Sequence, residues 1–395
     1  MIPNGWRRSV VRDACAIKNN LRLPLSTEVR VTMSGPYPYF GPTGVLGYID
    51  HFRIDEEFAL IGEDGDHFLK FRDKPMTLLF KGKANVNNHA HIIGDSNDCS
   101  ARWFYYWFMH RDLTAVLSRQ GVARYKLTKA GLEGLEICLP PKAEQARIVQ
   151  VLSAWNEAIV TSEQLLANCR KQKQALVERL TNGKKYLDEW SEFSLGELGV
   201  PFSGLSGKEG SDFGAGSPYI NVYKNHRIDI NALGLVKVVE GESQNRVLRG
   251  DILFTTSSET PNEVGMASVL QDDLADLFLN SFCFGYRLHN FNTLLPEYAG
   301  YLLRNQRTRI QFTKIAQGST RYNIGKNQTM RIKVRIPPLD EQKRIVSVLN
   351  QATGAVEVAL QQIEKLRVEK SALLQQLLTG KRRVQVPKQA EAALI

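Results

Sequence analysis

The most polar segment in the first half of the chain combines lysines with asparagines and histidines. Lys81 and Lys83 follow a short apolar stretch, and Asn87, Asn88 and His89 come soon after them. Asparagine amides suit hydrogen bonds with adenine, and lysine ammonium groups suit phosphate oxygens. The segment therefore indicates contact with a nucleic acid, and a solvated loop with asparagine turns is the alternative interpretation.

A hydroxyl-rich segment has a similar character in the second half. Thr256, Ser257, Ser258 and Asn262 follow an apolar stretch. Hydroxyl groups can bind phosphate oxygens or base edges, and a plain turn would have the same composition. Further along, one helical segment carries four basic residues that form either a phosphate-binding stripe or an ordinary charged face: Arg304, Arg307, Arg309 and Lys314.

One short pattern, Gly-x-x-Arg-Tyr, occurs twice. It contains Arg124 and Tyr125 in the first copy and Arg321 and Tyr322 in the second, 197 residues later, and Lys326 repeats a lysine of the first copy. The surrounding sequence differs, so the recurrence indicates a shared task. That task is either contact with phosphate or guanine, or bracing of a domain against the helix that follows.

Catalytic and metal-binding patterns are missing from the sequence. His89 and His91 are close together, but no third ligand is spaced to join them in a metal site. Asp95 leaves open an autonomous nuclease that uses these histidines. There is no GxxxxGK[ST], HExxH or GxSxG pattern, and the five cysteines include no CxxC. We therefore expect no catalytic residue, no bound metal and no disulfide framework.

The composition is that of a globular protein with a basic surplus. The 395 residues carry 51 Lys and Arg against 41 Asp and Glu, a net charge of +10, and 43% are apolar. No apolar run is long enough for a membrane span or a secretion signal, so we expect a reducing cytoplasm. The surplus charge is spread along the chain, which favours a long anionic partner over a single point of contact.

A long segment of the chain is duplicated. Residues 139–184 and 336–381 align without a gap and are identical at 18 of 46 positions. Each copy begins with Pro-Pro and an acidic residue and ends with Gly-Lys, which are start and stop signals of a helix. Apolar residues at alternating spacings of four and three predict that the two helices pair as a coiled coil. The residues expected to pair are Ile148, Leu152, Trp155, Ile159, Leu166, Leu176, Leu180, Ile345, Leu349, Val356, Ile363, Leu366, Leu373 and Leu377.

The paired helices would form a rod. Lys173 and Lys370 interrupt the two seams at the same place, which indicates that they fix the register. Residues 148–180 would span about 50 Å, compatible with DNA half-sites about 34–36 Å apart. Antiparallel helices would hold the globular parts at opposite ends and parallel helices would hold them side by side. Packing of each helix on its own globular part is the alternative.

These patterns predict an α+β chain in five parts. Residues 1–138 and 190–335 show short apolar stretches between turn residues and are expected to be globular. In each part these stretches are followed by a helix, expected at residues 101–118 in the first part and near 296–312 in the second. Residues 139–189 and 336–384 are the helical spacers. Residues 385–395 are expected to be a flexible tail.

The duplicated segments resemble the specificity (S) subunit of type I restriction-modification systems. The resemblance is carried by LPP/IPP-x-x-Glu-Gln-x-Arg-Ile-Val at residues 139–149 and 336–346, by the two Gly-x-x-Arg-Tyr loops and by the segment from Asn87 to His91. It covers nearly the whole chain. It implies a pseudo-two-fold internal repeat, an antiparallel coiled coil, and two target recognition domains that each read half of a bipartite, asymmetric site on double-stranded DNA.

The resemblance also implies partners. The chain itself would be non-catalytic and would bind no cofactor. It would dock two copies of a modification subunit that methylates adenine with S-adenosylmethionine, and through them restriction subunits that use ATP and Mg. The rivals are a coiled-coil scaffold without sequence-specific DNA binding and the nuclease described above. Steep salt dependence of DNA binding would separate DNA recognition from the scaffold.

Overall fold

The chain folds into two compact units. The computed structural model describes residues 2–120, 124–182, 190–221 and 225–386. Unit 1 comprises residues 1–162 and 362–395, and unit 2 comprises residues 163–361. Each unit therefore contains a part of both duplicated helices. Within the described residues, the structure has no helix that is long and apolar enough to cross a membrane.

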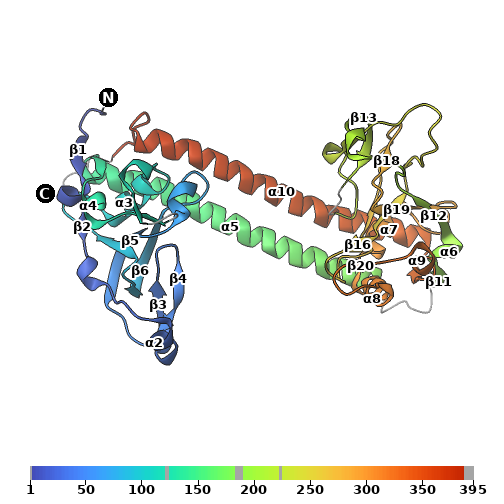
Figure 1. Cartoon of the computed structure of the whole chain (residues 1–395), viewed down its shortest axis with the longest axis horizontal. Coiled ribbons are helices and arrows are strands. Elements are labelled where there is room, and N and C mark those ends of the chain that lie inside the picture. Colours follow the sequence, from blue (N-terminus) through green and yellow to red (C-terminus); the bar gives the residue numbers. More distant parts are fainter. Residues whose placement is uncertain (1, 121–123, 183–189, 222–224, 387–395) are drawn as a thin grey trace. The chain divides into compact units, whose positions relative to one another are not determined.

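Unit 1 is built on a mixed six-stranded sheet with the order β2-β7-β5-β6-β3-β4 (Figure 1). Its strands are β2 (Ala16–Ile17), β3 (Ser34–Phe40), β4 (Val45–Ile49), β5 (Ile54–Gly62), β6 (Thr77–Val86) and β7 (Ala90–Gly94). Side chains alternate along β5, so Phe58 and Leu60 enter one buried cluster while Ala59 and Ile61 enter another. The central strand of the sheet is thus buried on both faces.

One face of this sheet packs on α3 (Ala101–Phe108), whose first turn is capped by Ser100. The sequence predicted a helix as far as residue 118, but α3 ends at Phe108 and only a 3-10 turn (Thr114–Val116) follows. The remaining elements of unit 1 are α1 (Val11–Ala14), α2 (Thr27–Thr32), α4 (Lys129–Glu133), β1 (Arg7–Val10), β8 (Ser118–Gln120), β9 (Arg124–Lys126), β10 (Glu136–Leu139) and 3-10 turns at Asn19–Leu21 and Asp66–Lys70.

Unit 2 divides its strands among smaller sheets, of which the largest has the order β12-β19-β15-β17. Its strands are β11 (Ser191–Ser194), β12 (Gly199–Ser203), β13 (Phe213–Ile220), β14 (Gly234–Val236), β15 (Ile252–Thr255), β16 (Ser257–Ser258), β17 (Ala267–Val269), β18 (Phe278–Leu279), β19 (Cys283–Leu288), β20 (Tyr322–Asn323) and β21 (Lys333–Ile336). Its short helices are α6 (Leu195–Leu198), α7 (Pro296–Leu302), α8 (Gln306–Ile315) and α9 (Lys326–Thr329), with 3-10 turns at Gly210–Asp212 and Ile230–Ala232.

The single helix predicted near residues 296–312 is two helices. The Asn305 side chain accepts a hydrogen bond from Thr308 N at 2.8 Å and so caps α8 where α7 has ended. The Asn305 amide also donates to Thr181 Oγ1 at 3.0 Å. The break therefore ties this part of unit 2 to the end of the first long helix.

The duplicated segments form the helices α5 (Lys142–Thr181) and α10 (Leu339–Leu378), each 40 residues long and about 60 Å in length (Figure 1). In unit 1, Leu152 and Leu377 share one buried cluster, while Ile159 and Lys370 line one pocket farther along α5. Residues later in α5 therefore lie beside residues earlier in α10. The predicted antiparallel pairing is confirmed.

Unit 2 shows the same direction of pairing. Val177 shares a buried cluster with Ile345 and Leu349, whereas Lys173, earlier in α5, interacts with Glu357, later in α10. All positions of the two predicted seams within 148–180 and 345–377 are buried or half-buried. Lys173 and Lys370 are among them, and burial lowers the pKa of both ammonium groups.

The duplicated Pro-Pro-x-x-Glu-Gln motif acts through its glutamine. Gln145 is buried and donates to Pro140 O at 3.0 Å and to Asp98 O at 2.7 Å. Gln342 is buried in unit 2 and donates to Pro337 O and Thr293 O, both at 2.8 Å. Each glutamine therefore binds the start of its long helix to the loop ahead of α3 or α7.

A tyrosine hydroxyl docks each globular part on its helix. Tyr106 in α3 bonds with Asn156 at 2.9 Å and Ser153 at 3.3 Å. In unit 2, Tyr301 in α7 bonds with two α10 residues that occupy the repeat positions of that pair, at 2.8 and 3.2 Å. The two copies of the helix thus present equivalent groups to equivalent tyrosines.

At the end of α10, Gly380 has φ +66, as its predicted capping role requires, while the corresponding Gly183 lies outside the described residues.

Candidate nucleic-acid interface

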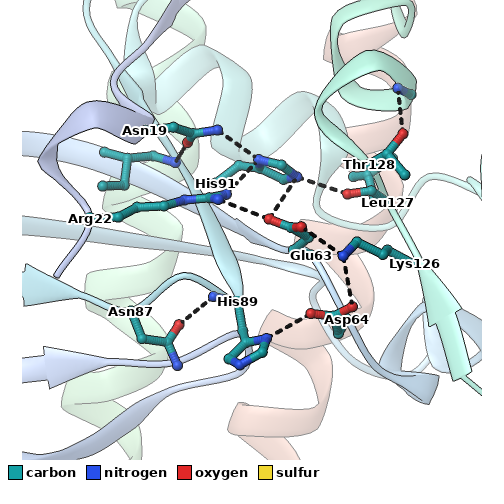
Figure 2. Close-up of polar contacts among 12 residues, drawn as sticks. Asn19, Arg22, Glu63, Asp64, Asn87, His89, His91, Lys126, Leu127 and Thr128 are labelled. Carbon is teal, nitrogen blue, oxygen red and sulfur yellow. Dashed lines mark hydrogen bonds and ion pairs between the residues drawn. The ribbon is translucent and has the colours of Figure 1, made fainter. Parts of the chain in front are cut away.

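In unit 1, the turn between β6 and β7 presents an exposed histidine. Asn87 is buried, and its Oδ1 accepts a hydrogen bond from His89 N at 2.9 Å (Figure 2). The carbonyl of His89 accepts from Glu63 N at 2.7 Å, which fixes the turn to the end of β5. The His89 side chain is 52% exposed, and its Nδ1 lies 2.7 Å from Asp64 Oδ2. The turn therefore places one imidazole at the surface on a fixed backbone.

The residues of the first Gly-x-x-Arg-Tyr loop and those that follow it contact the same short segment after β5. Leu127 N donates to Glu63 O at 2.8 Å, and Gly65 N donates to Tyr125 O at 3.0 Å. The Lys126 ammonium lies 3.1 Å from a Glu63 carboxylate oxygen and 3.8 Å from Asp64. Two sequence-predicted candidates, the His89 turn and Tyr125, are thereby attached to one short segment after β5.

His91 is the buried support beneath this turn. Its Nε2 lies 2.8 Å from Leu127 O, which can only accept, so Nε2 carries the proton. Its Nδ1 then accepts from Arg22 Nη2 at 2.7 Å and Asn19 Nδ2 at 3.0 Å. Burial lowers the pKa of His91, and the Arg22 charge acts in the same direction. The ring is therefore neutral, and both of its nitrogens are occupied.

These contacts give no support to the nuclease alternative. His91 has no nitrogen left for a metal or for proton transfer, and Asp95 Oδ1 accepts from Ala101 N at 2.8 Å at the start of α3. Within the described ranges, no three His, Cys, Asp or Glu side chains are placed to hold a metal ion. The hydrogen bond with Cys15 and burial both raise the pKa of the Cys99 thiol, which disfavours the thiolate form that a nucleophile needs.

Unit 2 contains the same frame. Asn280 Oδ1 accepts from Phe282 N at 2.9 Å, and the carbonyl of Phe282 accepts from Thr256 N at 3.3 Å and from its hydroxyl. Ile324 N donates to Thr256 O at 3.0 Å, and Ser258 pairs with Tyr322. Each of these bonds has a counterpart in unit 1, except the one from the Thr256 hydroxyl. The hydroxyl-rich segment and the second Arg-Tyr pair, predicted separately, therefore meet in the two-stranded sheet β16–β20.

The strand registers agree with this equivalence. Ile61 pairs with His91 between β5 and β7, and Phe254 pairs with Phe284 between β15 and β19. Each pair of counterparts is separated by 193 residues, as are His89 and Phe282. The long helices repeat at 197 residues instead, so the alignment that revealed the duplication does not bring these turns into register. The recurring Asn-x-His and Asn-x-Phe was the available signal, and it is too short to stand out.

The other predicted residues are dispersed. Lys81 and Lys83 do not follow a strand but lie within β6, exposed, opposite Glu57 and Asp55 of β5. The strand continues because Ala84 and Val86 still alternate into the core. Asn88 is exposed in the turn described above. Asn262 and Arg321 are exposed, Tyr322 is half-buried, and Lys326 donates to Ser203, whereas the side chain of Arg124 lies outside the described residues.

The four basic residues predicted to form one stripe do not share a surface, and Arg304 lies before α8 begins. Arg309 donates to the carbonyls of Gly265 and Asn262 at 2.7 and 3.0 Å, and burial lowers its pKa to about 10. Arg304 donates to Ala267 O at 2.6 Å. Only Arg307 and Lys314 line an open pocket. Two of the four cations therefore hold the backbone of unit 2 and are unsuited to a phosphate-binding stripe.

The two units thus share one backbone frame and present different side chains on it, as expected of a protein with an internal repeat. The chain belongs to the family described as type I restriction modification DNA specificity domain, whose model matches residues 3–168 and 188–367. The resemblance inferred from the duplicated segments is thus confirmed.

Individual relatives agree with this assignment. The chain is 27% identical to a type I restriction enzyme specificity subunit of Haemophilus influenzae over 377 residues, 89% of this chain and 91% of the relative. It is 22% identical to the MjaVIII specificity subunit of Methanocaldococcus jannaschii over 405 residues, 97% and 94% of the two chains. The S subunit of a type I restriction-modification system from M. genitalium shares the fold, with a TM-score of 0.59 at 15% identity over 95% and 97% of the chains.

Proposed function

We propose that each unit reads one half of a bipartite, asymmetric site on double-stranded DNA. The observation that carries this proposal is the repeated turn, which exposes His89 in unit 1 and Phe282 in unit 2 on the same hydrogen-bonded frame. The same backbone arrangement with different exposed side chains suits two related domains that recognise different DNA sequences. The net charge of +10 supports an anionic ligand.

We assign the parts of the chain accordingly. Residues 1–138 and 190–335 are the target recognition domains, and residues 139–189 and 336–384 are spacers whose length sets the gap between the half-sites. Residues 385–395 form a tail, and 387–395 lie outside the described residues. The DNA-binding set comprises Lys81, Lys83, Asn87, Asn88, His89, Arg124, Tyr125, Thr256, Ser257, Ser258, Asn262, Arg321, Tyr322 and Lys326. Within it, the buried Asn87 acts by holding the His89 turn and not by direct contact.

The partners follow from the family and from the repeat. The chain is non-catalytic, and modification subunits that use S-adenosylmethionine bind it and methylate adenine. Because the two helices repeat the same groups at equivalent positions, two copies of one modification subunit can dock. Restriction subunits that use ATP and Mg join the same complex.

The proposal is tested by mapping methylated adenines in cells with and without this chain. We expect a motif of two dissimilar halves with a fixed gap that disappears when the chain is deleted. Purified chain should bind that DNA with affinity that falls at least about 10³-fold between about 50 and about 200 mM salt. An unchanged methylation pattern, together with DNA binding that ignores sequence, would instead support the scaffold alternative.

A further inference from the structure

Phe282 is exposed in a way that folding alone does not explain. Its side chain is 71% exposed, more than any other aromatic residue in the part of the chain that the structure describes. A phenyl ring exposed to water contributes nothing to the core. It becomes stabilising only when a partner covers it and removes its apolar surface from water. A single exposed apolar residue is common on protein surfaces, so the exposure of Phe282 indicates a role only together with the geometry around it.

The backbone that carries Phe282 is held on several sides. Its N–H donates to Asn280 Oδ1 at 2.9 Å, and its carbonyl accepts from Thr256 N at 3.3 Å. The Asn280 amide donates to Asn221 Oδ1 at 2.8 Å. Gly204 packs so closely that a Cβ there would lie 2.2 Å from Asn280 O. Phe282 is therefore displayed on a fixed support, which is the arrangement of a contact residue and not of a loose surface loop.

The position of Phe282 is that of His89 in unit 1. Both follow an asparagine whose side chain accepts from the N–H two residues on, at 2.9 Å in each unit. Both carbonyls accept from the first residue after the neighbouring strand, Glu63 or Thr256. One frame thus presents a hydrogen-bonding ring in unit 1 and an apolar ring in unit 2.

We propose that Phe282 is a specificity-determining residue of unit 2, and that it reads its half-site by apolar contact with a thymine methyl group. This inference rests on the proposed function. The phenyl ring has no donor or acceptor, and the thymine methyl is the apolar group that base pairs expose in the major groove. The hydroxyl of Ser258 lies two residues after Thr256 in the same frame and supplies a polar contact beside it.

The test uses the full chain and a pool of random-sequence duplexes, with half-sites determined by selection and sequencing. Phe282→Ala should lose its preference at one position of the unit 2 half-site, with binding to the wild-type site weakened about 10-fold. The unit 1 half-site should stay the same. His89→Ala should show the opposite pattern. Phe291→Ala removes another exposed phenyl of unit 2 and should select the wild-type site at both halves.

A second measurement isolates the methyl group. Replacing thymine by uracil at the affected position should weaken wild-type binding several-fold and leave Phe282→Ala unaffected. If Phe282→Ala lowers the melting temperature and binds no duplex, Phe282→His decides, because it should select a different base at the same position. The inference would be overturned if Phe282→Ala or Phe282→His selected the wild-type half-site. It would also be overturned if uracil weakened binding of the wild type and of Phe282→Ala equally. A wild-type chain that selects no sequence would overturn the proposed function itself.

Discussion

The two units build the same turn over different interiors. Beneath the His89 turn, His91 is buried and joined to Leu127, Arg22 and Asn19 by hydrogen bonds. Beneath the Phe282 turn, the equivalent residue is Phe284, which is fully buried and stacks on Phe254 at 5.1 Å. The backbone bonds of the frame are alike in both units. The frame therefore depends on main-chain pairing, while the interior can be either polar and directional or apolar and close-packed.

The largest effect should come from emptying the apolar interior. Phe284→Ala removes a fully buried ring and should lower the free energy of unfolding by about 3–5 kcal/mol, because the cavity cannot close completely. Chemical denaturation of the purified chain measures this change. Phe282→Ala, two residues away but exposed, should cost less than about 0.5 kcal/mol. Equal costs for the two variants would contradict the description of this turn.

Exchanging the two interiors should cost somewhat less. His91→Phe leaves Leu127 O and Asn19 without their buried partner and should cost about 2–3 kcal/mol. Phe284→His buries an imidazole without partners and should cost a similar amount. Denaturation of each variant gives the values. If either exchange left the free energy of unfolding unchanged, the type of side chain beneath the turn would not matter for stability. That result would contradict the contrast drawn between the two units.

Lowering the pH should destabilise both units, because each unit contains a buried histidine. Burial lowers the pKa of His226 to about 3, and nearby cations such as Lys173 act in the same direction. Its pKa in the unfolded chain is about 6.5. The unfolded state thus gains a proton first as pH falls, and stability present above about pH 6.5 is lost below it, by about 1.4 kcal/mol at about pH 5.5.

The variant His226→Phe isolates this contribution. It keeps the stack on Tyr301, whose ring lies 4.2 Å away, and should unfold with a smaller loss of stability between about pH 7.5 and 5.5 than the wild type. His91 makes a contribution of the same sign in unit 1, because burial lowers its pKa as well. An identical pH dependence for His226→Phe and the wild type would mean that His226 has the same pKa in the folded and unfolded protein, and would contradict this account.

The smallest effect should come from an exposed cation. Lys81 lies exposed on β6 and has a phosphate-binding role in our account. Lys81→Ala should weaken DNA binding about two- to three-fold for every sequence and reduce the salt slope by about 1. Affinity measured over a salt series tests this. A change in the preferred half-site would instead make Lys81 a base-reading residue.

Much of the architecture was predictable from the sequence because the duplicated helix repeats over many turns. The heptad seam, the Pro-Pro starts and the terminal glycine Gly380 each carry a local physical signal. The Asn87–His89 turn was also found, since asparagine and histidine are unusual beside an apolar strand. The family followed from these features together.

The residues that complete the frame could not be found in this way. Glu63 and Thr256 participate through backbone N–H and carbonyl groups, and those contacts do not depend on the type of side chain. Phe282 looks like an ordinary core residue until its exposure is known. Arg304 and Arg309 looked like a surface stripe, but their partners are carbonyls brought close only by folding. Long-range contacts of this kind leave no spacing signal in the sequence.

The central claim is that two separate readers are set apart by a helical spacer of defined length. It is tested most directly by inserting one heptad at matching positions of α5 and α10 and mapping the methylated motif in cells. Seven residues preserve the seam and add about 10 Å, so the gap should grow by about three base pairs while both half-sites stay the same. An unchanged gap, or an altered half-site sequence, would contradict the claim.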